Sequence, residues 1–135
     1  MFMRESISIV IRKGEGGKDK FLLIKQVPDK PQPFTWLPPS GRIMEGETHE
    51  EACAREAKEE TGVDVKVIKK VFSMPAEYHA DFVHFYLADY VGGKVKIDPG
   101  EALDWGWFTI EEMAGMNLMK GTRLFFEKHF KGFRT

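Results

Sequence analysis

The sequence has little cysteine, little net charge and no long hydrophobic run. Cys53 is the single cysteine among 135 residues, so an internal disulfide is excluded and a reducing compartment is favoured. No apolar stretch approaches the roughly 18 residues of a membrane-spanning helix. The formal net charge of −1 argues against a general nucleic-acid coat and against a polybasic membrane anchor.

What is present is typical of one globular domain. The chain is long enough to bury a core without a disulfide, and its 13% aromatic content argues against intrinsic disorder. Residues 1–4 lack the basic-then-apolar layout of a signal peptide. We therefore expect a single domain over residues 1–135 in a soluble, cytoplasmic protein that binds neither bulk nucleic acid nor a membrane.

The near-neutral total hides two segments of opposite charge. Residues 41–63 contain seven glutamates and three basic residues, whereas residues 118–135 contain five basic residues and one glutamate. Acidic side chains are therefore concentrated in the middle of the chain.

Alternating polar and apolar residues predict the strands. Such patterns cover residues 6–13 and 20–27, and they recur over residues 63–74 and 81–91. Five of the seven prolines lie in residues 28–39, which predicts a rigid, irregular loop.

Two helices are predicted among these strands. Thr48 and Glu51 form a capping-box pattern before a run of good helix formers, and Gly62 is a natural end for that helix. A second helix is expected over residues 121–130, with core candidates Leu124, Phe125 and Phe130. Interleaved strands and helices indicate an α/β or α+β layered domain.

The first helix gathers carboxylates on one flank. Helical spacing places Glu56, Glu59 and Glu60 within one turn of each other, where like charges repel unless a cation neutralises them. The expected apolar stripe beside them consists of Cys53, Ala54 and Ala57. Taken alone, the helix fits either a solvated acidic face or a site for Mg²⁺ or Mn²⁺, which prefer oxygen ligands.

The longer segment from Gly41 to Val63 resembles the signature of the Nudix hydrolase family. The pattern is a glycine, five residues, a glutamate, seven residues, and then Arg-Glu-apolar-x-Glu-Glu-x-Gly-apolar. The matching positions are Gly41, Glu47, Arg55, Glu56, Glu59, Glu60, Gly62 and Val63. The sequence WLPP at residues 36–39 and Trp107 also look like the family.

The resemblance implies a fold, a reaction and a set of ligands. The implied fold is an α/β/α sandwich with a mixed β-sheet between helices, and the implied reaction hydrolyses a diphosphate linkage in a nucleotide. By resemblance, Glu56 and Glu60 bind the metal, Mg²⁺ or Mn²⁺, with Glu59 binding directly or through water. The backbone carbonyl of Gly41 is a further ligand, and Arg55 orients the glutamates.

A general base and substrate contacts complete the expected site. The base could be Glu101, Glu59 or Glu60, and the sequence does not choose among them. Outside the helix, the candidates for substrate contact are Lys25, Arg42 and Tyr78, with an exposed edge-strand lysine as the alternative interpretation of Lys25.

The substrate class follows by elimination within the family. The residues that mark ADP-ribose and coenzyme A hydrolases are not found at the expected places. A small nucleoside triphosphate pyrophosphatase of the MutT-like kind, releasing a monophosphate and pyrophosphate, is therefore the first expectation. Hydrolysis of dinucleoside polyphosphates or other nucleoside diphosphate derivatives is the second, and a catalytically silent nucleotide sensor is the third. A monomer or a homodimer is expected.

Overall fold

A computed structural model describes residues 4–76 and 80–133. In chain order its elements are β1 (Glu5–Glu15), β2 (Lys18–Gln26), β3 (Trp36–Leu37), β4 (Ser40–Arg42), α1 (His49–Thr61), β5 (Asp64–Pro75), β6 (Phe82–Gly92), β7 (Ala102–Phe108), α2 (Ile110–Ala114) and α3 (Lys120–His129).

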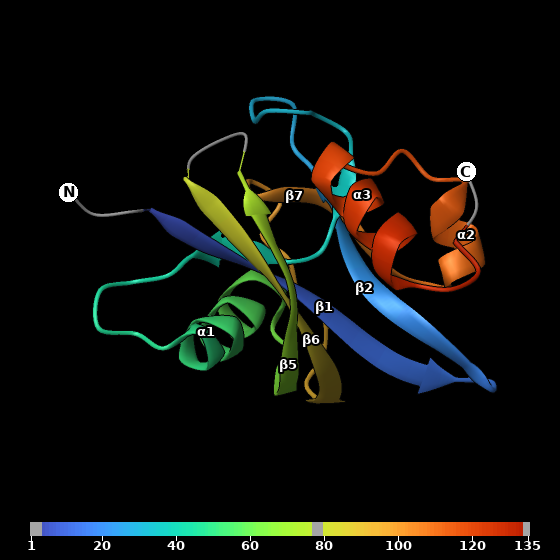
Figure 1. Cartoon of the computed structure of the whole chain (residues 1–135). Helices are drawn as coiled ribbons and strands as arrows, with labels where there is room; N and C mark the ends of the chain where they lie inside the picture. Colours follow the sequence, from blue (N-terminus) through green and yellow to red (C-terminus); the bar gives the residue numbers. More distant parts are fainter. Residues whose placement is uncertain (1–3, 77–79, 134–135) are drawn as a thin grey trace.

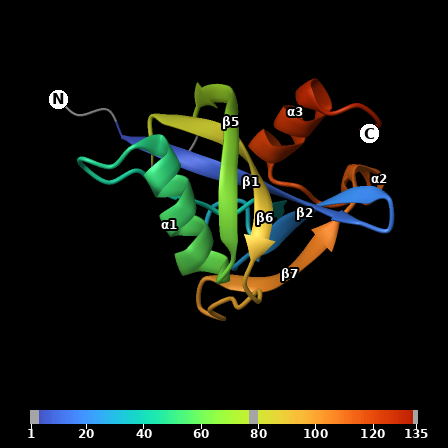
Figure 2. The same ribbon diagram turned by 90° about the horizontal axis from the view of Figure 1, so that it is seen from below.

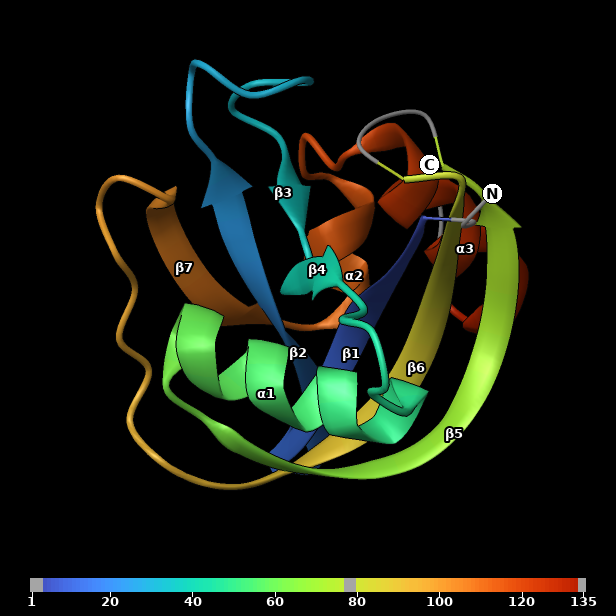
Figure 3. The ribbon, with the colours of Figure 1, turned by 90° about the vertical axis from the view of Figure 1, so that its left-hand side faces the viewer.

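The strands form one mixed sheet, with the order β3-β2-β1-β6-β5 (Figure 1). Strand β1 pairs in parallel with β6 and antiparallel with β2 and β4, and β7 pairs antiparallel with β2. Helix α1 covers one face of the sheet, and α2 and α3 lie on the other (Figures 2 and 3). The predicted α/β/α arrangement is confirmed.

Alternate side chains of the central strands divide the core into two layers. On β1, Ile7, Ile9 and Ile11 pack with α1, whereas Val10 belongs to the layer beneath α2 and α3. Because both faces of the sheet are covered, these strands carry near-continuous apolar runs.

Two predictions of buried helix residues are wrong. Leu124 is 39% exposed, whereas Phe125 and Phe126 are fully buried. The buried side of α3 consists of Thr122 and the residues three and four positions after it, which share one face of a helix. In α1, Ala54 is exposed, and Ala52 is buried in its place. Phe130 is partly buried and packs at the edge of the core.

The buried side of α1 is therefore turned toward the flank that carries Glu56 and Glu60, which brings these carboxylates close to the sheet.

Within the described residues, no helix combines the length and apolar character needed to cross a membrane.

Candidate active site

Helix α1 is fixed at both ends. The Thr48 hydroxyl accepts a hydrogen bond from the Glu51 amide at 3.1 Å, and the Glu51 carboxylate accepts one from the Thr48 amide at 2.9 Å. At the other end, Gly62 has a left-handed backbone (φ 77°) and donates its N–H to the Lys58 carbonyl at 2.9 Å. The predicted capping box and helix end are both present, so the glutamates are held at fixed spacing.

Arg55 connects the carboxylates to the loop before the helix. Its guanidinium donates twice to Glu47, at 2.6 and 2.9 Å, and donates to Glu56 at 2.8 Å and to Glu59 at 3.1 Å. It also donates to the carbonyl of Arg42 at 2.9 Å. The hydrogen bonds from Arg55 hold the pKa of Glu47 at about 2. Glu47 is therefore a stable anionic anchor for the loop.

Glu56 packs directly on the backbone of Gly41. A Cβ atom at position 41 would overlap the Glu56 carboxylate, so a larger residue there would displace it. Burial raises the pKa of Glu56, and the hydrogen bond from Arg55 opposes that shift. The contact places a carboxylate beside the β4 backbone, and the donors gathered here are oxygens, which suit a hard divalent cation.

Glu60 lies one helical turn after Glu56 and lines a cavity. Its carboxylate accepts a hydrogen bond from the Ser40 amide at 3.2 Å. Burial raises the pKa of Glu60 to about 8, and the charge of Glu56 contributes to the same shift. A carboxyl group with a strongly perturbed pKa in a cavity is typical of functional sites.

The cavity has a volume of about 710 Å³, within the range of small-molecule sites. Gly41 and Arg42 line it from β4, and Glu101 lines it from the segment before β7. Lys30 also lines the cavity and forms an ion pair with Glu101 at 2.7 Å. The cavity thus has an acidic side at Glu60 and basic groups at Arg42 and Lys30.

The structure therefore brings most of the predicted site residues together. Gly41, Arg42, Glu60 and Glu101 share the cavity, and Glu56 adjoins Gly41. Glu59 is exposed and is held by Arg55 outside the cavity lining. The roles of these residues as ligands or catalysts remain predictions.

Lys25 is not brought to the cavity. Its neighbours Ile24 and Gln26 line the cavity, and alternate side chains of a strand point to opposite faces. The Lys25 ammonium lies 5.9 Å from the ring centre of Trp36. Lys25 is also not on an edge, because β2 pairs with both β3 and β7 at this position. Tyr78, the other predicted substrate contact, falls outside the described residues.

Two features were missed in the sequence. Lys30 enters the cavity from the proline-rich loop, where only the rigidity of the prolines hinted at a fixed position. The second is His84, which meets His49 and Glu5 on the face of the sheet that α1 covers. These three come from distant segments, so no local spacing could reveal them.

Comparisons with known proteins add independent information. The NUDIX domain profile matches residues 3–128. The NAD-capped RNA hydrolase NudC of Deinococcus radiodurans is 33% identical over 108 residues, which are 80% of this chain and 38% of that protein. The NudC of Vibrio atlanticus is 37% identical over 95 residues, which are 70% of this chain and 35% of that protein. The chain thus spans well under half the length of these curated relatives.

Solved structures match over more of their own length. A MutT protein from Methanosarcina mazei is 28% identical with a TM-score of 0.75, and the match covers 92% of this chain and 90% of that one. An Ap4A hydrolase from C. elegans is 25% identical with a TM-score of 0.67, covering 84% and 85%. The Nudix domain of Shewanella oneidensis NrtR, in complex with ADP ribose, has a TM-score of 0.79 over 95% of this chain and 86% of that one. Its 19% identity supports the fold alone.

Proposed function

The chain belongs to the NUDIX domain family, and from this premise we propose that it hydrolyses a diphosphate linkage in a small nucleotide with the help of a divalent metal ion. The observation that carries the proposal is the position of the Glu60 carboxyl, which lines the cavity one helical turn from Glu56 and accepts a hydrogen bond from the Ser40 amide. Burial there raises the pKa of Glu60 to about 8. Two neighbouring carboxylates resist ionising together, and a bound cation removes that resistance.

The oxygen donors around Gly41 fit Mg²⁺ or Mn²⁺. The carboxylates of Glu56 and Glu60 and the carbonyl of Gly41 would hold the ion, with Glu59 binding directly or through water. The packing of Gly41 on Glu56 supports this assignment. A bound divalent ion would neutralise the diphosphate, polarise a phosphorus–oxygen bond and acidify a water molecule.

Other side chains would act on substrate or on the glutamates. Glu101 lines the same cavity as Glu60 and is the first candidate for the general base that accepts a proton from water. Arg42 and Lys30 offer positive charge to phosphate oxygens from the cavity lining. Arg55 is a positioning residue, because its donors are occupied by carboxylates and the loop backbone.

A nucleoside triphosphate, cleaved by water to a monophosphate and pyrophosphate, is the first substrate candidate. Its support is the resemblance to MutT-like pyrophosphatases, together with the 28% identity to a MutT protein over nearly the whole of both chains.

A nucleoside diphosphate joined to a second group is the other candidate. Its support is the similarity to proteins named NAD-capped RNA hydrolase and Ap4A hydrolase. Similarity to an NAD-capped RNA hydrolase means that RNA-linked substrates also belong among the candidates. The near-neutral net charge had argued against a nucleic-acid partner. A Nudix module that only senses nucleotide is disfavoured, because Glu56, Glu59 and Glu60 are all retained.

The test is a substrate panel for the full chain with Mg²⁺, with the products identified by chromatography. The panel contains nucleoside and deoxynucleoside triphosphates, diadenosine tetraphosphate, NAD, ADP-ribose and NAD-capped RNA. A Glu60→Gln variant, purified in parallel, controls for contaminating phosphatases.

Release of pyrophosphate with a nucleoside monophosphate is the expected result. Preferential cleavage of diadenosine tetraphosphate, NAD or NAD-capped RNA would transfer the proposal to the second candidate. No turnover of any compound would contradict the enzyme proposal and favour a sensor. Cytoplasmic location and a monomeric or homodimeric state stay predictions.

A further inference from the structure

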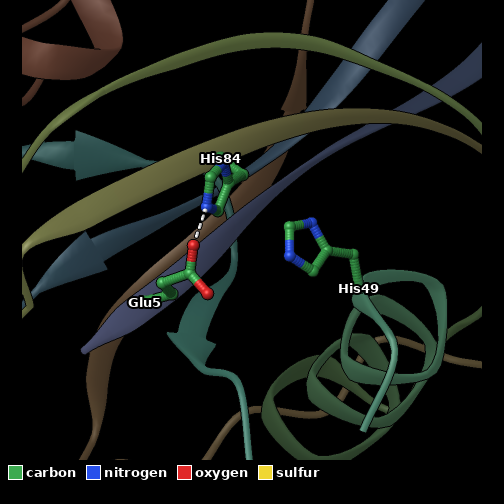
Figure 4. A group of neighbouring side chains, drawn as sticks. All are labelled: Glu5, His49 and His84. Carbon is green, nitrogen blue, oxygen red and sulfur yellow. Dashed lines mark hydrogen bonds and ion pairs between the residues drawn. The ribbon is translucent and has the colours of Figure 1, made fainter. Parts of the chain in front are cut away.

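Three potential metal ligands meet on the face of the sheet that α1 covers, and none of the three lines the cavity (Figure 4). Glu5 begins β1, His84 lies on β6, and His49 begins α1. The two faces are assigned by alternation. Ser6 and Val83 line the cavity, so the adjacent Glu5 and His84 point to the α1 face. The group therefore lies apart from the residues that line the cavity.

The ligand atoms are already close together. One atom from each of the three side chains lies within 4.8 Å of the others. His84 Nε2 and a Glu5 carboxylate oxygen are 2.9 Å apart, and the centres of the two imidazole rings are 4.6 Å apart. Ligand atoms of a tetrahedral zinc ion lie about 3.3 Å from each other, given bond lengths near 2.0 Å. Shifts on the order of 1 Å would complete such a site.

Both imidazoles have a second partner that fixes their orientation. His84 Nδ1 is 2.6 Å from the hydroxyl of Ser73, and His49 Nδ1 is 2.8 Å from the hydroxyl of Tyr86. With Nδ1 engaged in this way, the Nε2 atom of each ring is left to bind a metal. Outer hydrogen bonds of this kind are regular companions of metal-binding histidines.

The group is mostly shielded from solvent but is open on one side. The His84 side chain is 10% exposed and the Glu5 side chain 36% exposed, so an ion could enter from the Glu5 side. Two imidazoles and one carboxylate form a donor set found in zinc sites, in which water takes the fourth position. Imidazole nitrogens favour zinc and related transition ions over Mg²⁺.

We propose that Glu5, His49 and His84 form a second metal site, specific for Zn²⁺ or a related first-row transition ion and distinct from the glutamates at the cavity. The ion would join β1, β6 and the first turn of α1. It would therefore brace the helix that carries Glu56 and Glu60 against the sheet.

The test is a Zn²⁺ titration of the metal-free full chain, without a histidine tag, in competition with a chromophoric chelator. Wild type is expected to bind one Zn²⁺ at this site, with a rise in the melting temperature. His49→Ala and His84→Ala should each abolish that binding. Tyr86→Phe, which removes only the outer hydrogen bond to His49, should weaken it by about 10–100-fold.

Two matched controls separate this site from other zinc ligands. The Glu56→Gln/Glu60→Gln double variant removes the proposed ligands at the cavity, and His129→Ala removes an exposed histidine on α3. Both should retain the Zn²⁺ bound by the histidine group. Replacing Zn²⁺ with Co²⁺ gives a visible absorption spectrum that reports nitrogen ligation and a low coordination number.

Equal Zn²⁺ binding by wild type and His49→Ala would overturn the proposal, as would loss of binding only in the double glutamate variant. Failure of wild type to bind would reduce the group to a hydrogen-bonded polar cluster. If His84→Ala does not fold, the more accessible His49→Ala decides the result.

Discussion

At the scale of single residues, ionisation of the Glu60 carboxyl lowers the stability of the metal-free protein, whereas the proposed function uses the ionised form to bind a metal ion. Its pKa is raised from 4.5 to about 8, chiefly by burial. The folded state therefore holds a proton that the unfolded chain releases above pH 4.5. The favourable contribution is complete below that pH and is lost as the pH rises toward 8.

Glu60→Gln is accordingly expected to be more stable than wild type at pH 8 when no metal is present. The difference in free energy of unfolding should grow from pH 4.5 to pH 8, because the glutamine carries no charge to bury. Denaturant unfolding in the presence of a chelator, repeated across this pH range, measures the effect.

Glu59→Gln is the matched control, since it removes a negative charge from an exposed position of the same helix. If Glu60→Gln followed the same pH dependence as wild type, the proposed burial of this carboxyl would be contradicted. Added Mg²⁺ should raise the melting temperature of wild type more than that of Glu60→Gln.

At the scale of elements, α1 shows which features are readable from sequence. The capping box of Thr48 and the left-handed end at Gly62 depend on residues within the helix and its flanks, and both were predicted. Positions that depend on distant partners were not. Ala54 was misplaced because the rotation of α1 is set by its packing against the sheet. The edge-strand interpretation of Lys25 was wrong because the pairing of β2 on both sides is not encoded locally.

Removal of the α1 cap should have a modest and measurable cost. Thr48→Ala loses the hydroxyl that accepts from the Glu51 amide, and a loss of about 1 kcal/mol in the free energy of unfolding is expected. Thr109→Ala is a matched control, because Thr109 caps the five-residue helix α2 with the same pair of hydrogen bonds. Only Thr48→Ala should also weaken Mg²⁺ binding, since α2 carries none of the proposed ligands.

At the scale of the whole molecule, two apolar layers hold the sheet between its helices, and one of them supports the cavity. Phe125 of α3 is fully buried and stacks on Phe85 of β6, with ring centres 4.5 Å apart. Phe85 in turn lines the cavity. Packing beneath α3 is thus continuous with the proposed substrate site.

Phe125→Ala should lower the free energy of unfolding by about 3–5 kcal/mol, because it empties a position in the centre of that layer. The adjacent Leu124→Ala, on the exposed side of the same helix, should cost much less. Denaturant unfolding of both variants distinguishes them, and similar losses for the two would contradict the observed rotation of α3.

The overall architecture was predictable because the motif from Gly41 to Val63 identifies a family, and a family implies a fold. The proposed second metal site was not predictable from the sequence. Glu5, His49 and His84 carry no common motif, and they meet only because β1 and β6 pair in parallel beneath the start of α1. The net charge of the whole chain also gave no indication of a metal site, because the acidic segment at residues 41–63 is offset by the basic segment at residues 118–135.

If Glu60 belongs to the hydrolytic machinery rather than to an acidic surface, its replacement must slow the reaction. The most direct test is the turnover number of Glu60→Gln with Mg²⁺ on the best substrate of the panel, for protein shown to be folded by its unfolding curve. A kcat lower by about 10²–10⁴ is predicted. Turnover near that of wild type would contradict a role for Glu60 in hydrolysis.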